Sequence, residues 1–259
     1  MAELKTVASM LRHLSLTEAS TGLEAIAADA AINNLTPLEV LDKLLNHEIN
    51  GRNARAKAKR VKTAGFPCIE GLDSFNFERQ GFKGISKLHI KQLSELAWLE
   101  KAYNIMFLGP TGLGKTRLSI GIGLKAIDAG YNVSFVSLDQ LMRLLKTSEI
   151  SKRAAGKVRK IKNSDLVILD EVGFLPISKQ EANKLYEFVN ALYLKTSIIL
   201  TSNKSFEEWS DFLGDSIITA AILDRLVHQC EIFSLDGPSY RLENRNPYLE
   251  NNHWELCWK

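Results

Sequence analysis

The sequence predicts an α/β fold with a parallel sheet, preceded by a small unit made only of helices. From residue 104 onward, short apolar runs alternate with helical patterns, which is typical of a parallel sheet with helices on both faces. The first apolar run leads directly into a glycine-rich turn that ends in Lys-Thr. Residues 1–50 instead repeat leucine and alanine at helical spacing, so we assign them to a different unit.

The composition is that of a globular protein. Of the 259 residues, 45% are apolar and 24% are charged, which excludes a disordered chain. The N-terminal stretch lacks the apolar core of a secretory signal, and no apolar run approaches the ~20 residues of a membrane span. The cysteines, Cys68, Cys230 and Cys257, lack the paired spacing of a disulfide framework or zinc site. We therefore expect a cytoplasmic protein without a membrane partner.

The N-terminal unit is expected to consist of consecutive helices. Thr36 and Pro37, followed by Glu39, indicate a helix N-cap with proline in the first turn. Residues 51–62 have six basic residues and no acid, and their alanines favour a helix. Residues 63–80 contain glycine and proline and are interpreted as a connector. We assign residues 1–68 to a helical N-terminal domain and residues 69–259 to a second domain.

The second domain is expected to begin with a helix over residues 86–100, where leucines recur at helical spacing. Five strands separated by helical patterns should follow. The apolar runs that predict them are residues 105–108, 133–136, 166–169, 197–201 and 231–234.

Residues 109–116, GPTGLGKT, fit the pattern G-x-x-x-x-G-K-[ST] at every fixed position. The glycines let successive N–H groups point at phosphate oxygens, and the helix that starts near Lys115 adds its positive end. Lys115 is expected to reach the β- and γ-phosphates, and Thr116 to ligate Mg²⁺. Because a strand precedes the turn and an amphipathic helix follows it, we prefer a nucleotide site to a chance match. The expected nucleotide contacts are Gly109, Pro110, Thr111, Gly112, Leu113, Gly114, Lys115, Thr116 and Arg117.

The third and fourth strands end in polar residues suited to hydrolysis. Asp170 ends an apolar strand and should hold Mg²⁺, and Glu171 is positioned to polarise the attacking water as general base. An ordinary solvated acidic turn is the alternative. Asn203 follows the next strand and can bond the γ-phosphate or the water, although asparagine is also common in turns.

Two arginines near the C-terminus can stabilise transition-state charge on a γ-phosphate, one of them from a neighbouring subunit. Arg225 lies in a helical stretch rich in isoleucine and leucine, and Arg241 follows the last strand. The simpler interpretation of each arginine is a surface salt bridge, and Asp224 offers Arg225 a local partner.

The segments GPTGLGKT, LVILDE, ILTSN, LDRL and GPSYR, in this order and spacing, resemble the AAA+ ATPases. More closely, the chain resembles the branch that contains DnaC-type helicase loaders and IstB transposition helper proteins. The continuation LDEVGFLPIS, the segment AILDRLVHQCEIFSLDGPSYR and the basic N-terminal unit are most similar to IstB. The resemblance covers nearly all of residues 10–245.

The resemblance implies a P-loop AAA+ three-layer sandwich, with a five-stranded parallel sheet in which the Asn203 strand lies between the two Walker strands. It implies ATP and Mg²⁺ as cofactors. Lys115 and Thr116 correspond to Walker A, Asp170 and Glu171 to Walker B, and Asn203 to sensor 1. By the same resemblance, Arg225 corresponds to the arginine finger that acts on a neighbouring subunit and Arg241 to the sensor 2 arginine. Thr111 and Leu113 differ from many relatives at variable positions, and the helical lid of larger members is expected to be short or missing.

Two acid-free basic stretches predict contacts with DNA phosphates, whose binding would release condensed cations. Neither stretch has aromatic residues for stacking single-stranded bases or a base-reading pattern, so we expect duplex binding with little sequence preference. A solvated helix face or flexible arm is the alternative. The expected contacts are Arg52, Arg55, Lys57, Lys59, Arg60 and Lys62 in the first stretch and Lys152, Arg153, Lys157, Arg159 and Lys160 in the second.

Together with the resemblance to IstB, these features imply an ATPase that forms ATP- and DNA-dependent homo-oligomers on duplex DNA and assists the transposase of the same element. A DnaC-type helicase loader is the main alternative, which would prefer single-stranded DNA and bind a replicative helicase. A P-loop kinase or nucleotide-gated adapter without a DNA role is the third, which would be monomeric and insensitive to the loss of Arg225.

Overall fold

The computed structural model describes residues 2–174 and 176–244. The chain forms two compact units, Met1–Lys62 and Thr63–Lys259. The boundary suggested by the sequence, after residue 68, lies inside the second unit, where the Phe66 ring packs edge-on against Phe135 at 6.1 Å. No helix of the described ranges is both long and apolar enough to cross a bilayer.

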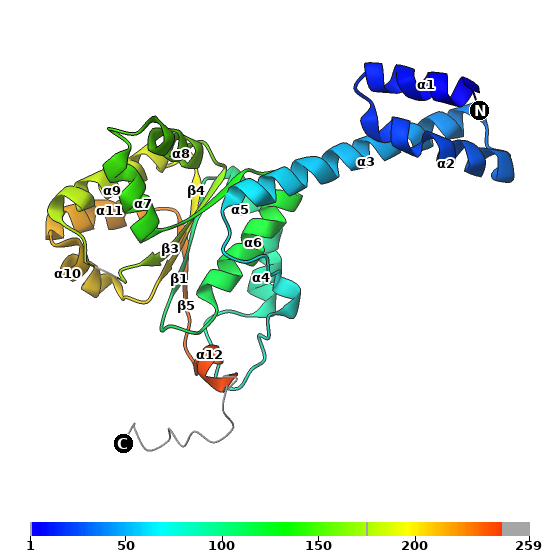
Figure 1. The fold of residues 1–259 in the computed structure, drawn as a ribbon. Coiled ribbons are helices and arrows are strands. Elements are labelled where there is room, and N and C mark those ends of the chain that lie inside the picture. The colour runs from blue at the N-terminus through cyan, green and yellow to red at the C-terminus, as the bar shows by residue number, and fades with distance from the viewer. Residues whose placement is uncertain (1, 175, 245–259) are drawn as a thin grey trace, which may run out of the picture. The chain divides into compact units, whose positions relative to one another are not determined.

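The first unit is made of helices, as predicted. They are α1 (Ala2–His13), α2 (Thr17–Asn33) and α3 (Pro37–Ala64) (Figure 1). α3 begins at the predicted proline, because Glu39 Oε2 accepts hydrogen bonds from the backbone N–H and the hydroxyl of Thr36, both at 2.7 Å. The helix continues without interruption through the basic residues 51–62.

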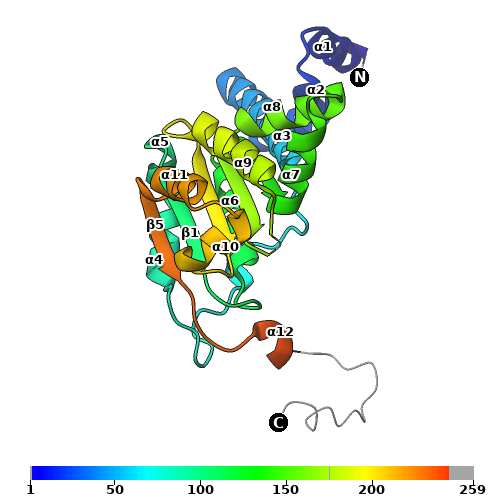
Figure 2. The same cartoon turned by 90° about the vertical axis from the view of Figure 1, so that its left-hand side faces the viewer.

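The second unit contains a five-stranded parallel sheet in the order β2-β3-β4-β1-β5, with β5 at one edge (Figure 2). Each strand overlaps one of the five predicted runs. The strands are β1 (Asn104–Leu108), β2 (Val133–Ser137), β3 (Leu166–Val172), β4 (Ser197–Ser202) and β5 (Cys230–Ser234). The strand that precedes Asn203 lies between β3 and β1, as the resemblance implied.

Helices cover both faces of the sheet, which gives the expected three layers. Figure 1 shows α4 (Lys87–Ser94) and α6 (Lys115–Asp128) on one face, and α7 (Leu138–Thr147), α9 (Lys179–Leu192) and α11 (Ser216–Val227) on the other. The remaining elements are α5 (Ala97–Glu100), α8 (Lys152–Lys162), α10 (Trp209–Leu213), α12 (Tyr240–Glu243) and the 3₁₀ turns η1 (Leu72–Ser74) and η2 (Phe206–Glu208).

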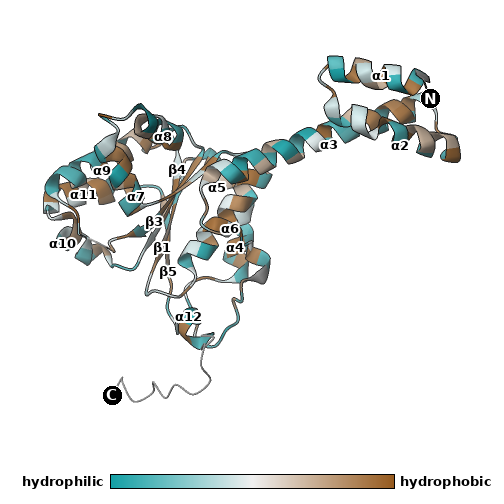
Figure 3. Ribbon diagram, in the orientation of Figure 1, coloured by the Kyte–Doolittle hydropathy of each residue, from teal (hydrophilic) through white to brown (hydrophobic). Residues whose placement is uncertain are grey.

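The core lies on both sides of the sheet, because side chains alternate along each strand. On β1, Met106 and Leu108 belong to the cluster that includes Phe188 of α9 and Trp209 of α10. All five residues of β1 are buried, as expected for a central parallel strand covered by helices on both faces. The hydrophobic colouring of the strands in Figure 3 follows from this arrangement.

The prediction of one helix over residues 86–100 was wrong. α4 ends at Ser94, and Leu96 adopts a left-handed conformation (φ 62°) before the short helix α5. The break keeps Leu93, Leu96 and Leu99 buried. The Trp98 indole N–H satisfies the Leu93 carbonyl at 2.8 Å, next to the break. The spacing of the buried leucines fits an uninterrupted helix equally well, so helical periodicity does not reveal the break.

Candidate nucleotide-binding site

The glycine-rich turn between β1 and α6 has a backbone that only glycine adopts easily. Gly109 and Gly112 have φ of 135° and 82°. A Cβ at Gly112 would lie 2.0 Å from Ser239 Oγ, and one at Gly109 would lie 2.1 Å from the Leu235 carbonyl oxygen. The absence of side chains at these two positions therefore lets the segment that follows β5 pack directly on the turn.

Lys115 begins α6 and its ammonium folds back over the turn. Nζ donates to the carbonyl oxygens of Gly109 at 2.5 Å and Pro110 at 2.6 Å. Burial lowers the pKa of Lys115; nearby Asp170 opposes this shift and Arg241 adds to it. A partly desolvated cation over a turn of inward-facing backbone is suited to an anion such as a triphosphate.

Asp170 lies at the carboxyl end of β3 and is buried, with 5% of its surface exposed. The Thr116 hydroxyl donates to its two carboxylate oxygens at 3.0 and 3.1 Å. Mg²⁺ in nucleotide sites takes one or two carboxylates together with hydroxyl, water and phosphate oxygens. The paired oxygen groups of Thr116 and Asp170 fit that donor set.

Glu171 has an exposed side chain and an uncommon backbone conformation, with φ of 59°. It lies in a register shift of β3 against β4, between Leu169 and Val172. The strand end therefore bends so that Asp170 is buried and Glu171 is exposed. Asn203 follows β4 in a bend and is half-buried. Because β4 runs parallel to β3, the two strands end at the same edge of the sheet.

Arg241 is exposed in α12, and its positive charge contributes to the lowered pKa of Lys115. The segment before it is fixed to the P-loop, because the Tyr240 N–H donates to the Gly112 carbonyl at 3.0 Å. Arg117, in the first turn of α6, pairs with Glu70 at 3.1 Å. Arg117 thus lies in the helix that continues the P-loop, and Arg241 lies in a segment that is bonded to it.

An aromatic cluster lies beside the P-loop and was not predicted, because residues 63–80 were interpreted only as a connector. Phe75 packs against Gly114, where a Cβ would lie 2.6 Å from its ring, and Phe77 and Phe82 lie 4.6 and 5.8 Å from Phe75 between ring centroids. The Arg79 guanidinium lies 4.7 Å from the centroid of Phe82. The repeated phenylalanines of FNFERQGF were the available signal. An aromatic wall next to a phosphate-binding turn is suited to a planar base.

Arg225, on α11, is half-buried among side chains of α9. Its Nε donates to Asn190 Oδ1 at 2.9 Å and its Nη1 to the Ala221 carbonyl at 2.9 Å. The guanidinium lies 4.7 Å from the ring centroid of Tyr186 and 5.9 Å from that of Tyr193. These contacts restrict the side chain before any neighbouring subunit is present. They do not test its role as a finger, which stays a prediction.

Helix α8 is amphipathic, with a buried apolar face and an exposed basic face. Ala154, Val158 and Ile161 are buried. The predicted DNA contacts are all exposed: Lys152, Arg153, Lys157, Arg159 and Lys160. Lys160 Nζ also donates to the Thr63 carbonyl, and burial lowers the pKa of Lys160. The exposed face of α8 therefore carries five cationic side chains on one helix.

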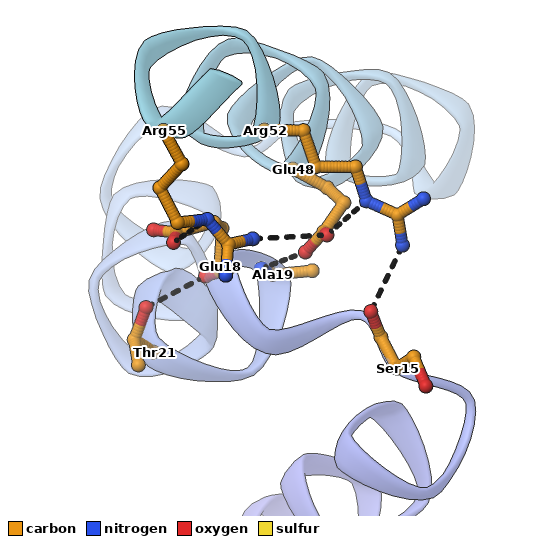
Figure 4. Close-up of polar contacts among 7 residues, drawn as sticks. All are labelled: Ser15, Glu18, Ala19, Thr21, Glu48, Arg52 and Arg55. Carbon is orange, nitrogen blue, oxygen red and sulfur yellow. Dashed lines mark hydrogen bonds and ion pairs between the residues drawn. The ribbon is translucent and has the colours of Figure 1, made fainter. Parts of the chain in front are cut away.

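The basic residues of α3 divide into two groups. Arg52 and Arg55 bind within the N-terminal unit (Figure 4): Arg55 Nε contacts Glu18 of α2 at 3.1 Å, whereas Arg52 Nε contacts buried Glu48 of its own helix at 2.6 Å and Arg52 Nη2 donates to the Ser15 carbonyl at 2.9 Å. Glu48 also accepts the Ala19 N–H at 2.9 Å, and this bond and Arg52 lower the pKa of Glu48. The second group lies further along the helix, where Lys57, Lys59 and Lys62 are exposed and Arg60 is half-buried. DNA contact by any of these residues stays a prediction.

Comparisons with known proteins agree with this geometry. Residues 9–247 match the family of IstB-like ATP binding proteins. The ATP-binding protein of insertion sequence IS21 from Pseudomonas aeruginosa is 37% identical over 236 residues, covering 91% of this chain and 88% of the relative. An IS21-like ATP-binding protein from Bacteroides fragilis is 34% identical over 252 residues, covering 97% and 95%. The crystal structure of DnaI, at 19% identity, has a TM-score of 0.53 and covers 66% of this chain and 90% of DnaI, which shows a likeness of fold alone.

Proposed function

This chain belongs to the family of IstB-like ATP binding proteins, and from that premise we propose that it is an Mg²⁺-dependent ATPase that assembles on duplex DNA and assists the transposase of its insertion sequence. The observation that carries the ATPase proposal is the contact of Thr116 with Asp170 beside exposed Glu171. These are the groups that metal-assisted hydrolysis needs, brought together at the carboxyl ends of parallel strands.

In this proposal the P-loop and Lys115 bind the phosphates, and Thr116 and Asp170 hold Mg²⁺. The ion would neutralise charge on the β- and γ-phosphates. Glu171 accepts the proton of the attacking water, and Asn203 orients that water or the γ-phosphate. The aromatic wall of Phe75, next to Gly114, receives the base.

DNA binding is supported by α8, whose exposed cations include Arg153 and Lys157. Its contacts would be with phosphates, so affinity should fall steeply with salt and depend little on sequence. The second basic group, Lys57 to Lys62 on α3, adds a further cationic surface in the other unit.

Oligomerisation is supported by the position of Arg225, whose guanidinium is restrained on α11 without an acidic partner in the contacts described above. We propose that it completes the ATP site of a neighbouring subunit, so that ATP favours the oligomer. An assembly of this kind aligns successive α8 helices along DNA.

The proposal is tested by fluorescence anisotropy of a labelled duplex with a non-hydrolysable ATP analogue, with ADP and without nucleotide. The analogue should tighten duplex binding, and the doubly substituted Arg153→Glu, Lys157→Glu protein should bind weakly with a salt slope reduced by roughly 2. Lys91→Glu, at an exposed lysine of α4, is the matched control and should bind like the wild type. Duplex binding unaffected by nucleotide would contradict the proposal, and a strong preference for single strands would favour a helicase loader.

A further inference from the structure

The Thr201 hydroxyl joins the two acidic residues of the site. Thr201 is 2% exposed and lies near the end of β4, next to β3 in the sheet. Its Oγ1 donates to Asp170 Oδ1 at 2.6 Å and accepts the backbone N–H of Glu171 at 3.0 Å. One hydroxyl supplies one donor and can accept in return, so the two bonds are compatible.

The irregular pairing of β3 with β4 explains why a side chain makes these bonds. Leu169 pairs with Leu200 and Val172 with Ser202, so two residues of β3, Asp170 and Glu171, lie opposite Thr201 alone. Such a bulge leaves a backbone group without its usual ladder partner. The Thr201 hydroxyl takes the place of that partner for the Glu171 N–H.

The same bond stabilises the unusual backbone of Glu171, whose φ is 59°. Residues other than glycine keep such a conformation only where surrounding contacts support it. Asp170 is likewise restrained by two hydroxyls, from Thr116 on α6 and Thr201 on β4. The direction of the Asp170 carboxylate and the course of the backbone at Glu171 therefore depend on one side chain.

We propose that Thr201 is a positioning residue that sets the Asp170 carboxylate and the Glu171 backbone relative to each other for metal binding and hydrolysis. The inference rests on the proposed ATPase function. Neither of the two Thr201 bonds is to the P-loop or to Lys115, so loss of the hydroxyl should leave nucleotide binding without metal unchanged.

Three variants test this. Thr201→Val removes the hydroxyl with little change of shape, and Thr201→Ser retains it. Thr196→Val is the control: it makes the same threonine-to-valine change just before the other end of β4, where the Thr196 hydroxyl donates to the Ser164 carbonyl at 3.3 Å. Each is measured for kcat and KM with ATP, for thermal stability, and for affinity of an ATP analogue with and without Mg²⁺.

Thr201→Val should lower kcat roughly 10- to 100-fold, the range seen when groups that orient metal ligands are removed, and weaken the Mg²⁺-dependent gain in analogue affinity. In Thr201→Ser and Thr196→Val, kcat and the Mg²⁺-dependent gain in analogue affinity should both stay within about threefold of the wild-type values, because the Thr201 position keeps its hydroxyl. Wild-type kcat and Mg²⁺ dependence in a folded Thr201→Val protein, or equal losses in the serine variant, would overturn the inference.

Turnover and the Mg²⁺ dependence of analogue affinity separate this inference from the proposed function. Should the wild type bind ATP but not hydrolyse it, the ATPase proposal fails. The Mg²⁺ dependence of analogue affinity in Thr201→Val and Thr201→Ser still decides whether the hydroxyl positions Asp170, because this readout requires no turnover. If Thr201→Val does not fold, Thr201→Ala removes the hydroxyl in its place: a weaker Mg²⁺ dependence in Thr201→Ala than in Thr201→Ser supports the inference, and equal Mg²⁺ dependence in the two overturns it.

Discussion

The Thr116 hydroxyl lies 3.0 Å from Asp170 Oδ1, across 54 residues of sequence. This contact joins the first turn of α6 to the carboxyl end of β3, although β4 separates β1 from β3 in the sheet. Parallel strands end at one edge, so the residues that follow β1, β3 and β4 meet there. The site can therefore be tested by changes at each of these ends.

Replacing Lys115 with alanine should weaken ATP binding at least tenfold, because the partly buried ammonium lies directly over the P-loop. Equilibrium binding of a fluorescent ATP analogue measures the effect. Lys125→Ala, an exposed lysine in the last turn of the same helix, is the control and should bind normally. Equal affinities of the two variants would argue against the P-loop as the nucleotide site.

Replacing Glu171 with glutamine should lower kcat roughly 100-fold or more while ATP affinity stays nearly unchanged, because the amide cannot accept the water proton. Phosphate release and analogue binding measure the two quantities. Glu187→Gln, at an exposed position on α9, should retain normal turnover. Substantial hydrolysis by the Glu171→Gln protein would exclude this residue as the base.

Replacing Arg225 with alanine should lower ATPase activity and the nucleotide-induced increase in particle mass together, since the proposed contact crosses between subunits. Arg225→Lys should restore little, because an ammonium cannot reproduce the planar guanidinium that lies over Tyr186. Light scattering with and without an ATP analogue measures the assembly. Arg143→Ala, at an exposed arginine of α7, is the control. Unchanged assembly and turnover in Arg225→Ala would contradict the shared site.

Replacing Glu48 with glutamine should lower the stability of the N-terminal unit at neutral pH, because the buried carboxylate bonds Arg52 and the Ala19 N–H. The folded-state pKa of Glu48 is lowered from 4.5, so its contribution is present above about pH 4.5 and is lost as pH falls through the lower folded value. Acid should therefore destabilise the wild type more than the variant. Hydrogen exchange of α2 and α3 at two pH values measures this, with exposed Glu24→Gln as the control.

Replacing Gly156 with alanine should stabilise the second unit by roughly 1 kcal/mol, because this glycine lies inside α8 and its Cβ would meet only open space. Gly121→Ala, the same change inside α6, should destabilise instead. There the Cβ would lie 2.5 Å from Leu72 Cγ. Denaturant unfolding measures both variants. Stabilisation of both would contradict the clash expected at Gly121, and destabilisation of both would contradict the gain expected at Gly156.

Residues close in sequence made much of the site predictable. Lys115 and Thr116 lie in one local turn, and the apolar run before Asp170 marks its strand. The strand order and the family followed from motif spacing and resemblance, and the comparisons confirm the family. The break at Leu96 was missed because the leucine spacing fits an uninterrupted helix as well as two helices with a turn between them.

The sequence by itself determined which residues end the strands and which form the phosphate turn, because hydrophobic periodicity and glycine spacing act over a few residues. Only the tertiary structure decided that Thr201 bonds both Asp170 and Glu171, that Phe75 lies against Gly114, and that Arg225 lies over Tyr186. Those contacts join elements separated by about 30 or more residues. Their formation depends on the register of the sheet and the packing of helices on it, which no local pattern specifies.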